Sequence, residues 1–221
     1  MVWDFTEINS LSDSAGGYSN CIDWVCEAIS FALQAGAAGA GVTCHLGSSM
    51  EMQGGDIDLV VTDPPYYDAI PYSDLMDFYH VWLRRGLSDL DLGFDSAFSS
   101  NLGPKWDKEK SSGELIDQPS RFGFDLEKSR RNYEDGMAAV FKRCHEMLRQ
   151  DGRMVVVFAN KQPDAWATLV SALIRAGFVV DGSWPIQTER ASRSNALAAA
   201  ALASSVWLGC RKRGPMRRAG W

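Results

Sequence analysis

The sequence predicts an α/β fold built on a mostly parallel sheet whose last strand is antiparallel. Short β-branched segments alternate with longer segments whose apolar residues recur at helical spacing. Such alternation is typical of parallel sheets, in which helices connect successive strands. The last two expected strands have no obvious helical crossover between them, which favours an antiparallel final strand. A length of 221 residues suits one domain.

The first half of the chain is predicted to hold two helices and two strands after an irregular arm. Helical spacing of apolar residues indicates each helix, and Gly36 and Gly39 end the first one. A β-branched run indicates the second strand, which ends at two prolines because proline cannot donate to a sheet. The expected ranges are arm 1–17, helix 19–34, strand 41–47, strand 59–61 and helix 73–85.

The second half is predicted to continue the alternation of helix and strand. Asp151 and Gly152 end a long helix, and Gly177 ends the next one. Runs rich in valine follow both of these helix ends and indicate strands. The expected ranges are helix 127–150, strand 153–159, helix 166–176, a strand running from 178 towards 184, and strand 205–210.

Residues 87–125 form a long insertion within the predicted domain, because they show no clean period and contain several Gly, Ser and Pro residues. A loop of this length in a compact domain is usually functional or disordered. Aromatic residues are interspersed there with lysines and an arginine. This mixture suits a lid or a nucleic-acid contact with stacking faces. The simpler alternative is an excursion whose aromatic residues anchor it to the core.

Composition and charge bear on several classes of protein. The formal net charge is −6, although the tail 211–218 holds five cationic residues. A chain this acidic is poorly suited to binding the phosphates of DNA without a partner. The five cysteines form no CxxC pair or zinc-ligand spacing, which predicts reduced thiols, a cytoplasmic protein and no metal site. No apolar run is long enough to cross a membrane, and we expect no signal peptide.

The most informative stretch follows the strand expected at 59–61. Asp63, two prolines and Tyr66 come together at the carboxyl end of that strand, which is where open α/β sheets bind ligands. A carboxylate and a rigid proline carbonyl can accept both N–H bonds of an exocyclic amine, which frees the lone pair of its nitrogen for attack. Tyr66 offers a flat face to a base that has left its helix. The simpler alternative is a Pro-Pro turn followed by a core tyrosine.

This stretch resembles a known family. Asp63-Pro64-Pro65-Tyr66 is similar to the DPPY catalytic motif of amino-group DNA methyltransferases that use S-adenosylmethionine. The longer run 63–75 resembles large prokaryotic adenine-specific DNA methylases that carry a domain of unknown function at the amino-terminal end. Segments near both ends of the chain share this resemblance, which covers nearly all of the chain but only the later part of those longer proteins.

The resemblance implies a Rossmann-like S-adenosylmethionine-dependent methyltransferase fold. The implied reaction is methyl transfer to a DNA base, adenine N6 before cytosine N4, in the setting of restriction–modification or phage defence. Asp at position 63 favours DNA, since protein and ribosomal-RNA methylators usually carry Asn there. The implied roles are amine orientation by Asp63 and Pro64, loop stiffening by Pro65, base stacking by Tyr66, substrate binding by Tyr67 and Asp68, and cofactor contact by Ser48.

The 221 residues lack a glycine-rich turn suited to the methionine part of the cofactor. Residues 36–41 are the richest candidate, but they follow a helix and precede a strand, which is the wrong order. We therefore expect residues 1–221 to form a single, partial methyltransferase domain without the first two strands, which leaves apolar ladder edges beside the central strand. Three interpretations stay open: a target-amine half completed by a second chain or upstream segment, an enzyme active alone, and a non-catalytic remnant that binds nucleic acid or protein.

Overall fold

The computed structural model describes residues 9, 11–14, 17–36, 41, 43, 48–68, 70–87, 113–186 and 205–214. The chain divides into two compact units, Met1–Leu46 and Gly47–Trp221, and each is considered by itself. The described part of the first unit contains one helix, α1 (Tyr18–Gly36), which confirms the helix expected at 19–34. Most of the strand expected at 41–47 lies outside the described residues.

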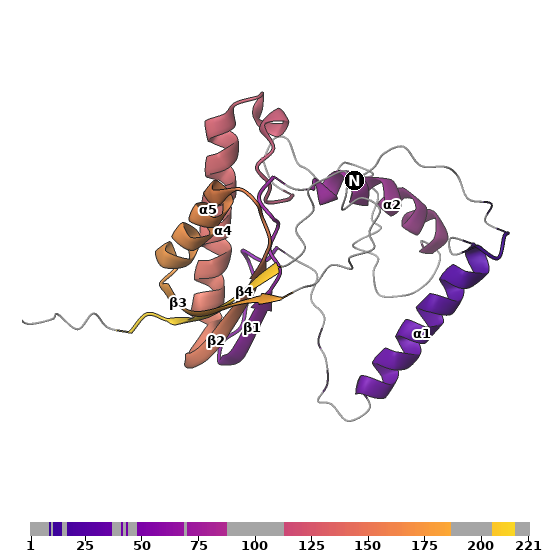
Figure 1. The fold of residues 1–221 in the computed structure, drawn as a ribbon, viewed down its shortest axis with the longest axis horizontal. Coiled ribbons are helices and arrows are strands. Elements are labelled where there is room, and N and C mark those ends of the chain that lie inside the picture. Colours follow the sequence, from indigo (N-terminus) through magenta and orange to yellow (C-terminus); the bar gives the residue numbers. More distant parts are fainter. Residues whose placement is uncertain are drawn as a thin grey trace, which may run out of the picture. The chain divides into compact units, whose positions relative to one another are not determined.

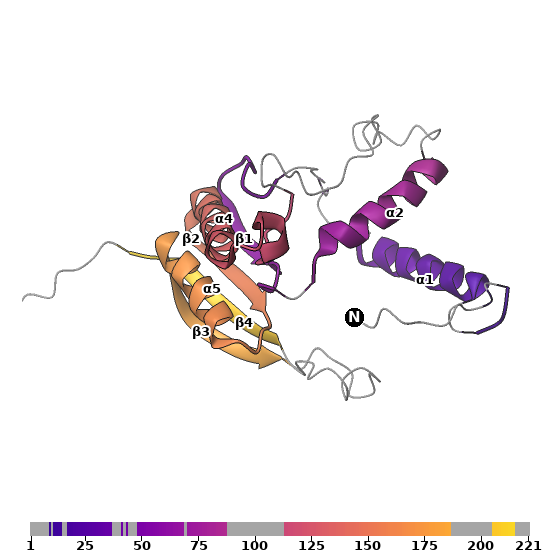
Figure 2. The same cartoon turned by 90° about the horizontal axis from the view of Figure 1, so that it is seen from above.

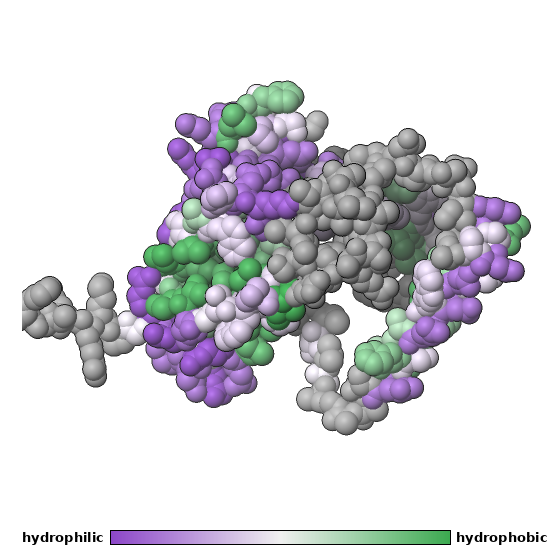
Figure 3. Space-filling model, viewed as in Figure 1, coloured by the Kyte–Doolittle hydropathy of each residue, from purple (hydrophilic) through white to green (hydrophobic). Residues whose placement is uncertain are grey.

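Helix α1 carries large apolar side chains at its surface. Trp24, Phe31 and Leu33 are each more than half exposed, at 56%, 74% and 69%. Figure 3 shows hydrophobic and hydrophilic residues interspersed along this helix. The helix therefore buries little of its apolar surface within the described part of its own unit.

The described residues of the second unit form a sheet of four strands in the order β1-β2-β4-β3 (Figure 1). Strand β1 pairs with β2 in parallel, and β4 lies between β2 and β3 and is antiparallel to both. The prediction of an antiparallel last strand is thus confirmed. The strand bounds are β1 (Ile57–Thr62), β2 (Leu148–Phe158), β3 (Phe178–Ile186) and β4 (Ser205–Lys212).

The prediction of a mostly parallel sheet is corrected by this pairing. Strands β1, β2 and β3 run in one direction, but only one hydrogen-bonded pair of neighbours in the described sheet is parallel. The physical reason is the insertion of β4 between β2 and β3, which turns a parallel neighbour relation into two antiparallel ones. Such mixed sheets are common in α/β proteins.

The helices of the second unit confirm the expected ones with shifted ends. α4 ends at Met147 and β2 begins at Leu148, which pairs with Ile57 before a bulge brings Leu59 opposite Arg153. Because Leu148 already pairs with β1, strand β2 begins earlier than predicted and helix α4 ends earlier. The helix bounds are α2 (Tyr72–Leu87), the short 3-10 helix η1 (Pro119–Phe122), α4 (Leu126–Met147) and α5 (Pro163–Arg175).

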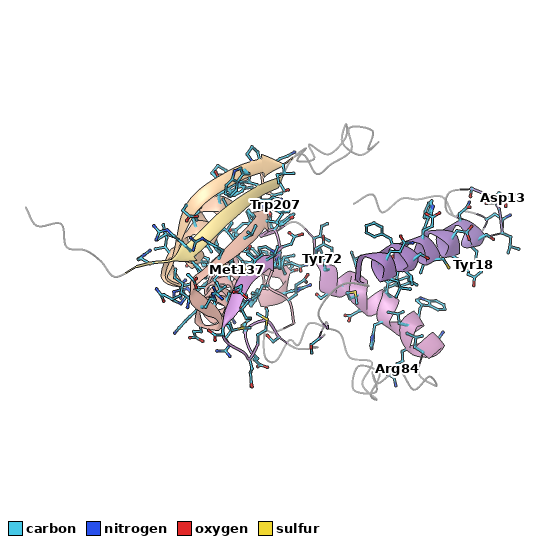
Figure 4. All side chains as sticks on the ribbon, turned by 90° about the horizontal axis from the view of Figure 1, so that it is seen from below. Asp13, Tyr18, Tyr72, Arg84, Met137 and Trp207 are labelled. Atoms are coloured by element: carbon cyan, nitrogen blue, oxygen red, sulfur yellow. The ribbon has the colours of Figure 1, made fainter. Side chains whose placement is uncertain are left out.

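Helices α4 and α5 lie together on one face of the sheet, where the core is found (Figures 1 and 2). Met154, Val156 and Phe158 alternate along β2 and are completely buried on that face. Met137 of α4 lies in the crowded layer between helix and strands (Figure 4). Each large side chain buried in this way contributes about 1.5–3 kcal/mol to folding.

The first strand is less covered than the others. Leu59 and Val61 of β1 are 54% and 60% exposed, whereas Val60 between them packs against the core. Within the described part of the chain, β1 pairs only with β2, so its other edge is open. An apolar parallel strand is normally covered on both faces and both edges. We call the unpaired side of β1 the open edge.

Two further findings bear on the sequence-based expectations. Cys144 and Cys210 are buried, Cys21 and Cys26 are exposed, and all four are free thiols. Among the described helices, none is both long and apolar enough to span a bilayer.

Gly152 provides a test of the packing between β1 and β2. A Cβ atom at this position would lie 3.0 Å from the carbonyl oxygen of Ile57 and 3.1 Å from that of Arg149, and neither backbone atom can move freely. We expect Gly152→Ala to lower the free energy of unfolding by about 1–3 kcal/mol, the usual cost of overpacking. Urea unfolding followed by circular dichroism measures this change.

Gly55 supplies the matched control, since a Cβ atom there would meet nothing within 4 Å. We expect Gly55→Ala to change the free energy of unfolding by less than about 0.5 kcal/mol. Equal stability of the two variants would contradict the described register of β1 on β2.

Candidate active site at the end of β1

The loop Asp63–Asp68 leaves β1 at the carboxyl end of the sheet. Thr62, the last residue of β1, pairs with Val156 of β2, which anchors the start of the loop to the buried strand. Asp63 and Asp68 are exposed, Tyr67 is buried, and the residues from Pro64 to Tyr66 are half-buried. The structure therefore places the predicted residues 63–66 at the carboxyl end of the sheet, with Asp63 exposed to solvent.

Three successive carbonyl oxygens of this loop accept hydrogen bonds from different parts of the second unit. The hydroxyl of Tyr133, on α4, donates to Pro65 O at 2.7 Å. The side-chain amide of Asn160, just beyond β2, donates to Tyr66 O at 3.1 Å. The backbone N–H of Asp117 donates to Tyr67 O at 3.1 Å. The course of the backbone after Pro65 is thus fixed from three directions.

The two acceptors that the motif predicts, the Asp63 carboxylate and the Pro64 carbonyl, differ from these three carbonyls in their hydrogen bonding. Within the described part of the chain, neither the Asp63 carboxylate nor the Pro64 carbonyl takes part in a hydrogen bond or ion pair. The neighbouring carbonyls are occupied, and these two remain available to a ligand. Fixed acceptors next to a cleft are suited to receive the N–H groups of a bound molecule without rearrangement.

Tyr67 supports the loop from the side that faces α4. Its φ of 64° lies in the left-handed region, which costs a bulky residue on the order of 1–3 kcal/mol and persists only where the surroundings hold it. Its ring is 2% exposed and packs edge to face on Tyr133, with 5.2 Å between ring centroids. Burial raises the pKa of the Tyr67 hydroxyl to about 12, and that oxygen accepts a hydrogen bond from Arg130 Nε at 2.8 Å.

Backbone strain of this kind is concentrated at functional sites, so the left-handed φ of Tyr67 indicates that this loop is a functional site. Tyr67 itself faces α4, and its predicted contact with substrate stays a prediction that the geometry does not favour.

Two pockets meet at the Asp63–Pro65 turn. The first, which we call the aromatic pocket, has a volume of about 320 Å³ and is lined by Asp63, Pro64, Pro65, Tyr66, Ile70 and Tyr72. The second, the apolar pocket, has a volume of about 450 Å³ and lies between β1 and α4. Asp63, Pro64 and Pro65 line both pockets. Both volumes are in the range of small-molecule sites.

Tyr66 forms one wall of the aromatic pocket. Its ring packs edge to face on Phe158 at 5.5 Å between centroids, and Phe158 in turn packs on Trp166 at 5.0 Å. Tyr66 is half-buried and keeps part of its surface towards the pocket. A ring that is held by a nearly perpendicular neighbour while part of its surface stays accessible is suited to stacking.

The remaining predicted residues lie at the margins. Asp68 is exposed and its carboxylate accepts a hydrogen bond from Gln162 Nε2 at 2.8 Å. Ser48 lines a separate, larger hollow of about 870 Å³ beside α4, and it does not line either pocket at Asp63. Its neighbour Ser49 lines both that hollow and the apolar pocket, so the structure places Ser49, not Ser48, beside the acceptor turn.

The start of α2 is held by a buried ion pair from the end of the predicted insertion. The carboxylate of Glu114 accepts hydrogen bonds from the N–H groups of Tyr72 and Ser73, at 2.7 Å and 3.2 Å. Arg121 donates to the same carboxylate at 3.0 Å, and the two side chains are only 6% and 9% exposed. Residues 88–112 of the insertion lie outside the described residues.

Two aromatic residues of the insertion can be compared with its predicted roles. Phe122 is buried and pins η1 to the unit, whereas Phe124 is 79% exposed. The first agrees with an excursion anchored to the core. The second leaves the alternative of an exposed stacking face open.

Sequence reasoning missed the residues that hold the loop. Tyr133, Asp117 and Glu114 have no motif of their own, and only the fold brings them to the loop. Asn160 carried a usable signal, because it lies two residues beyond the end of β2, at the end of the sheet where β1 also ends. Arg211, assigned to a basic tail, lies in β4 and pairs with Asp181 at 3.4 Å.

Comparison of the chain with protein-family models and with curated proteins finds no match. Among the described residues, no group of three or more His, Cys, Asp or Glu side chains is placed to hold a metal ion.

The buried ion pair provides a second test. We expect Glu114→Ala to lower the free energy of unfolding by about 3 kcal/mol, because it removes the buried carboxylate that pairs with the buried guanidinium of Arg121, whose other carboxylate partner, Asp74, is 57% exposed. Chemical unfolding measures the loss. Asp135→Ala is the matched control: it removes an exposed carboxylate paired with Arg175 at 2.8 Å, and we expect a change below about 1 kcal/mol. Similar losses in both variants would show that the Glu114 pair is not structural.

Proposed function

We propose that this chain carries the target-amine half of an S-adenosylmethionine-dependent DNA amino-methyltransferase that acts in the cytoplasm. One observation carries the proposal. The Asp63 carboxylate and the Pro64 carbonyl accept no hydrogen bond from any described residue, and they line both the aromatic pocket and the apolar pocket. A group-transfer reaction requires two ligands that meet at one fixed point, and this turn offers such a point.

The chemistry follows from the two acceptors. The amine of adenine or cytosine is a weak nucleophile because its lone pair is delocalised into the ring. Hydrogen bonds from its two N–H groups to Asp63 and Pro64 favour a tetrahedral nitrogen, whose lone pair then forms the new N–C bond. The S–C bond breaks as its electron pair returns to sulfur, and one amine proton leaves to Asp63 or to water. Adenine N6 is the first candidate and cytosine N4 the second.

The apolar pocket fits part of the methyl donor. S-adenosylmethionine would supply the methyl group on a sulfonium, which is an activated leaving group. Val60, Met137 and Phe141 line a slot in which a flat purine ring can be buried, beside Asp63 and Ser49. The methionine part requires a glycine-rich turn after a strand, and the 221 residues contain none in that order.

The open edge of β1 supports a division of the enzyme into two parts. A segment that carries the glycine turn would also bring a strand, and β1 offers an unpaired parallel edge with Leu59 and Val61 more than half exposed. Pairing there would place the turn next to the carboxyl end of β1, where Asp63 lies. The complementing segment is either a second chain or an upstream part of the same polypeptide.

The proposal predicts that Asp63 is essential for transfer. We expect the chain, supplied with the segment encoded directly upstream, to transfer labelled methyl groups to DNA. Asp63→Ala should lower kcat about 100- to 1000-fold, the usual effect of removing one fixed hydrogen-bonding group from a reaction site. Nucleoside analysis of the product separates N6-methyladenine from N4-methylcytosine.

Asp151→Ala serves as control, because that side chain is 75% exposed and lies near the start of β2, at the opposite end of the sheet. Its activity should match that of the native chain. Full activity in Asp63→Ala would remove the assigned role. A chain that acts only as a binding module would keep its partner or nucleic-acid affinity in Asp63→Ala and show no transfer.

The division of the enzyme predicts a second behaviour. We expect the chain alone to bind S-adenosylmethionine more weakly than about 10 μM, near −7 kcal/mol, and the mixture with the complementing segment to bind more tightly. Leu59→Lys places a charge on β1 at its open edge, outside the lining of the apolar pocket, and should abolish that gain, while the exposed position leaves folding intact. Calorimetry measures both. Tight binding by the chain alone would contradict the missing half.

A further inference from the structure

Tyr72 is a second aromatic residue of the aromatic pocket. It is the first residue of α2, and it lines the pocket together with Asp63 and Tyr66. Its side chain is 55% exposed, so its ring is accessible to a ligand. Figure 4 marks Tyr72 at the first turn of the helix.

Hydrogen bonds to a buried cluster hold the backbone of Tyr72 in place, although its side chain is exposed. Its N–H donates to Glu114 Oε1 at 2.7 Å, and the hydroxyl of Ser73 donates to Glu114 Oε2 at 2.7 Å. Arg121 donates to the Ser73 hydroxyl at 2.7 Å and to Glu114 at 3.0 Å. This buried cluster fixes the point from which the ring projects. A tyrosine side chain has two rotatable angles, so it loses little entropy on binding.

We propose that Tyr72 is a second stacking residue, so that a flipped nucleobase lies between Tyr66 and Tyr72 while its amine reaches Asp63. The inference rests on the proposed function, since it names the ligand of the same site. Every base has a π face, and enzymes that act on extruded bases hold them between aromatic or apolar side chains. The ligand class is a base of single-stranded or locally unpaired DNA.

The test is a fluorescence titration with a short single-stranded DNA that carries one 2-aminopurine, whose emission falls when it stacks on an aromatic ring. We expect saturable quenching by the native chain. Tyr72→Ala should weaken binding about 5- to 150-fold, which corresponds to the 1–3 kcal/mol typical of one base–aromatic stack. Tyr72→Phe keeps the ring and should bind as the native chain does.

Tyr79→Ala is the matched control. Tyr79 is on the same helix and is 58% exposed, but it does not line the aromatic pocket. Its loss should leave the affinity unchanged. Absence of quenching by the native chain, native affinity in Tyr72→Ala, or an equal loss in Tyr79→Ala would each overturn the assignment of Tyr72.

The result separates this inference from the proposed function. If Asp63→Ala abolishes methyl transfer while Tyr72→Ala binds DNA normally, the reaction stands and the role of Tyr72 falls. If Tyr72 is required for stacking in a chain that never transfers a methyl group, the base-binding pocket stands and the reaction falls.

Discussion

The hydrogen bond from the Tyr133 hydroxyl to the Pro65 carbonyl, 2.7 Å long, is the constraint on which the candidate site depends. Tyr133 is completely buried, so the bond is made in the core, where an unsatisfied hydroxyl would be costly. It fixes the peptide that follows Pro65, and the left-handed turn at Tyr67 then directs the chain away from the sheet. Because the carbonyls of the three later residues accept hydrogen bonds from protein donors, the Asp63 carboxylate and the Pro64 carbonyl are the acceptors of this turn left without a partner among the described residues. The arrangement exists before any ligand arrives, which is what preorganisation requires.

Much of the fold follows from local patterns in the sequence. The helical period of α4 and α5, and the β-branched runs of β1 and β2, identify these elements because each buries one face or one run of apolar residues. Pairing between strands does not follow from such patterns. The insertion of β4 between β2 and β3, and the early start of β2 opposite Ile57, depend on contacts between distant segments. Local periodicity carries no information on those contacts, so the proportion of parallel pairs was predicted wrongly.

In the candidate site, too, the sequence predicts the local part and not the contacts between distant segments. The acceptor turn could be found in the sequence because its residues are contiguous and two prolines are rare in a strand end. The residues that support it are separated from it by 68 positions for Tyr133 and 94 for Asn160. The pair of Glu114 with the start of α2 spans 42 positions. Each is a common residue type in an ordinary local context, so only the fold reveals that they converge on one loop.

The unpaired side of β1 has a consequence for the amount of this chain that a cell can keep. An apolar strand with free N–H and C=O groups attracts other extended segments, including those of identical copies. Copies made in excess of a covering segment would be exposed to proteolysis and to deposition in aggregates. Under the proposed division of the enzyme, the abundance of this chain would follow the supply of the complementing segment rather than its own rate of synthesis, so that the two would be produced in matched quantities.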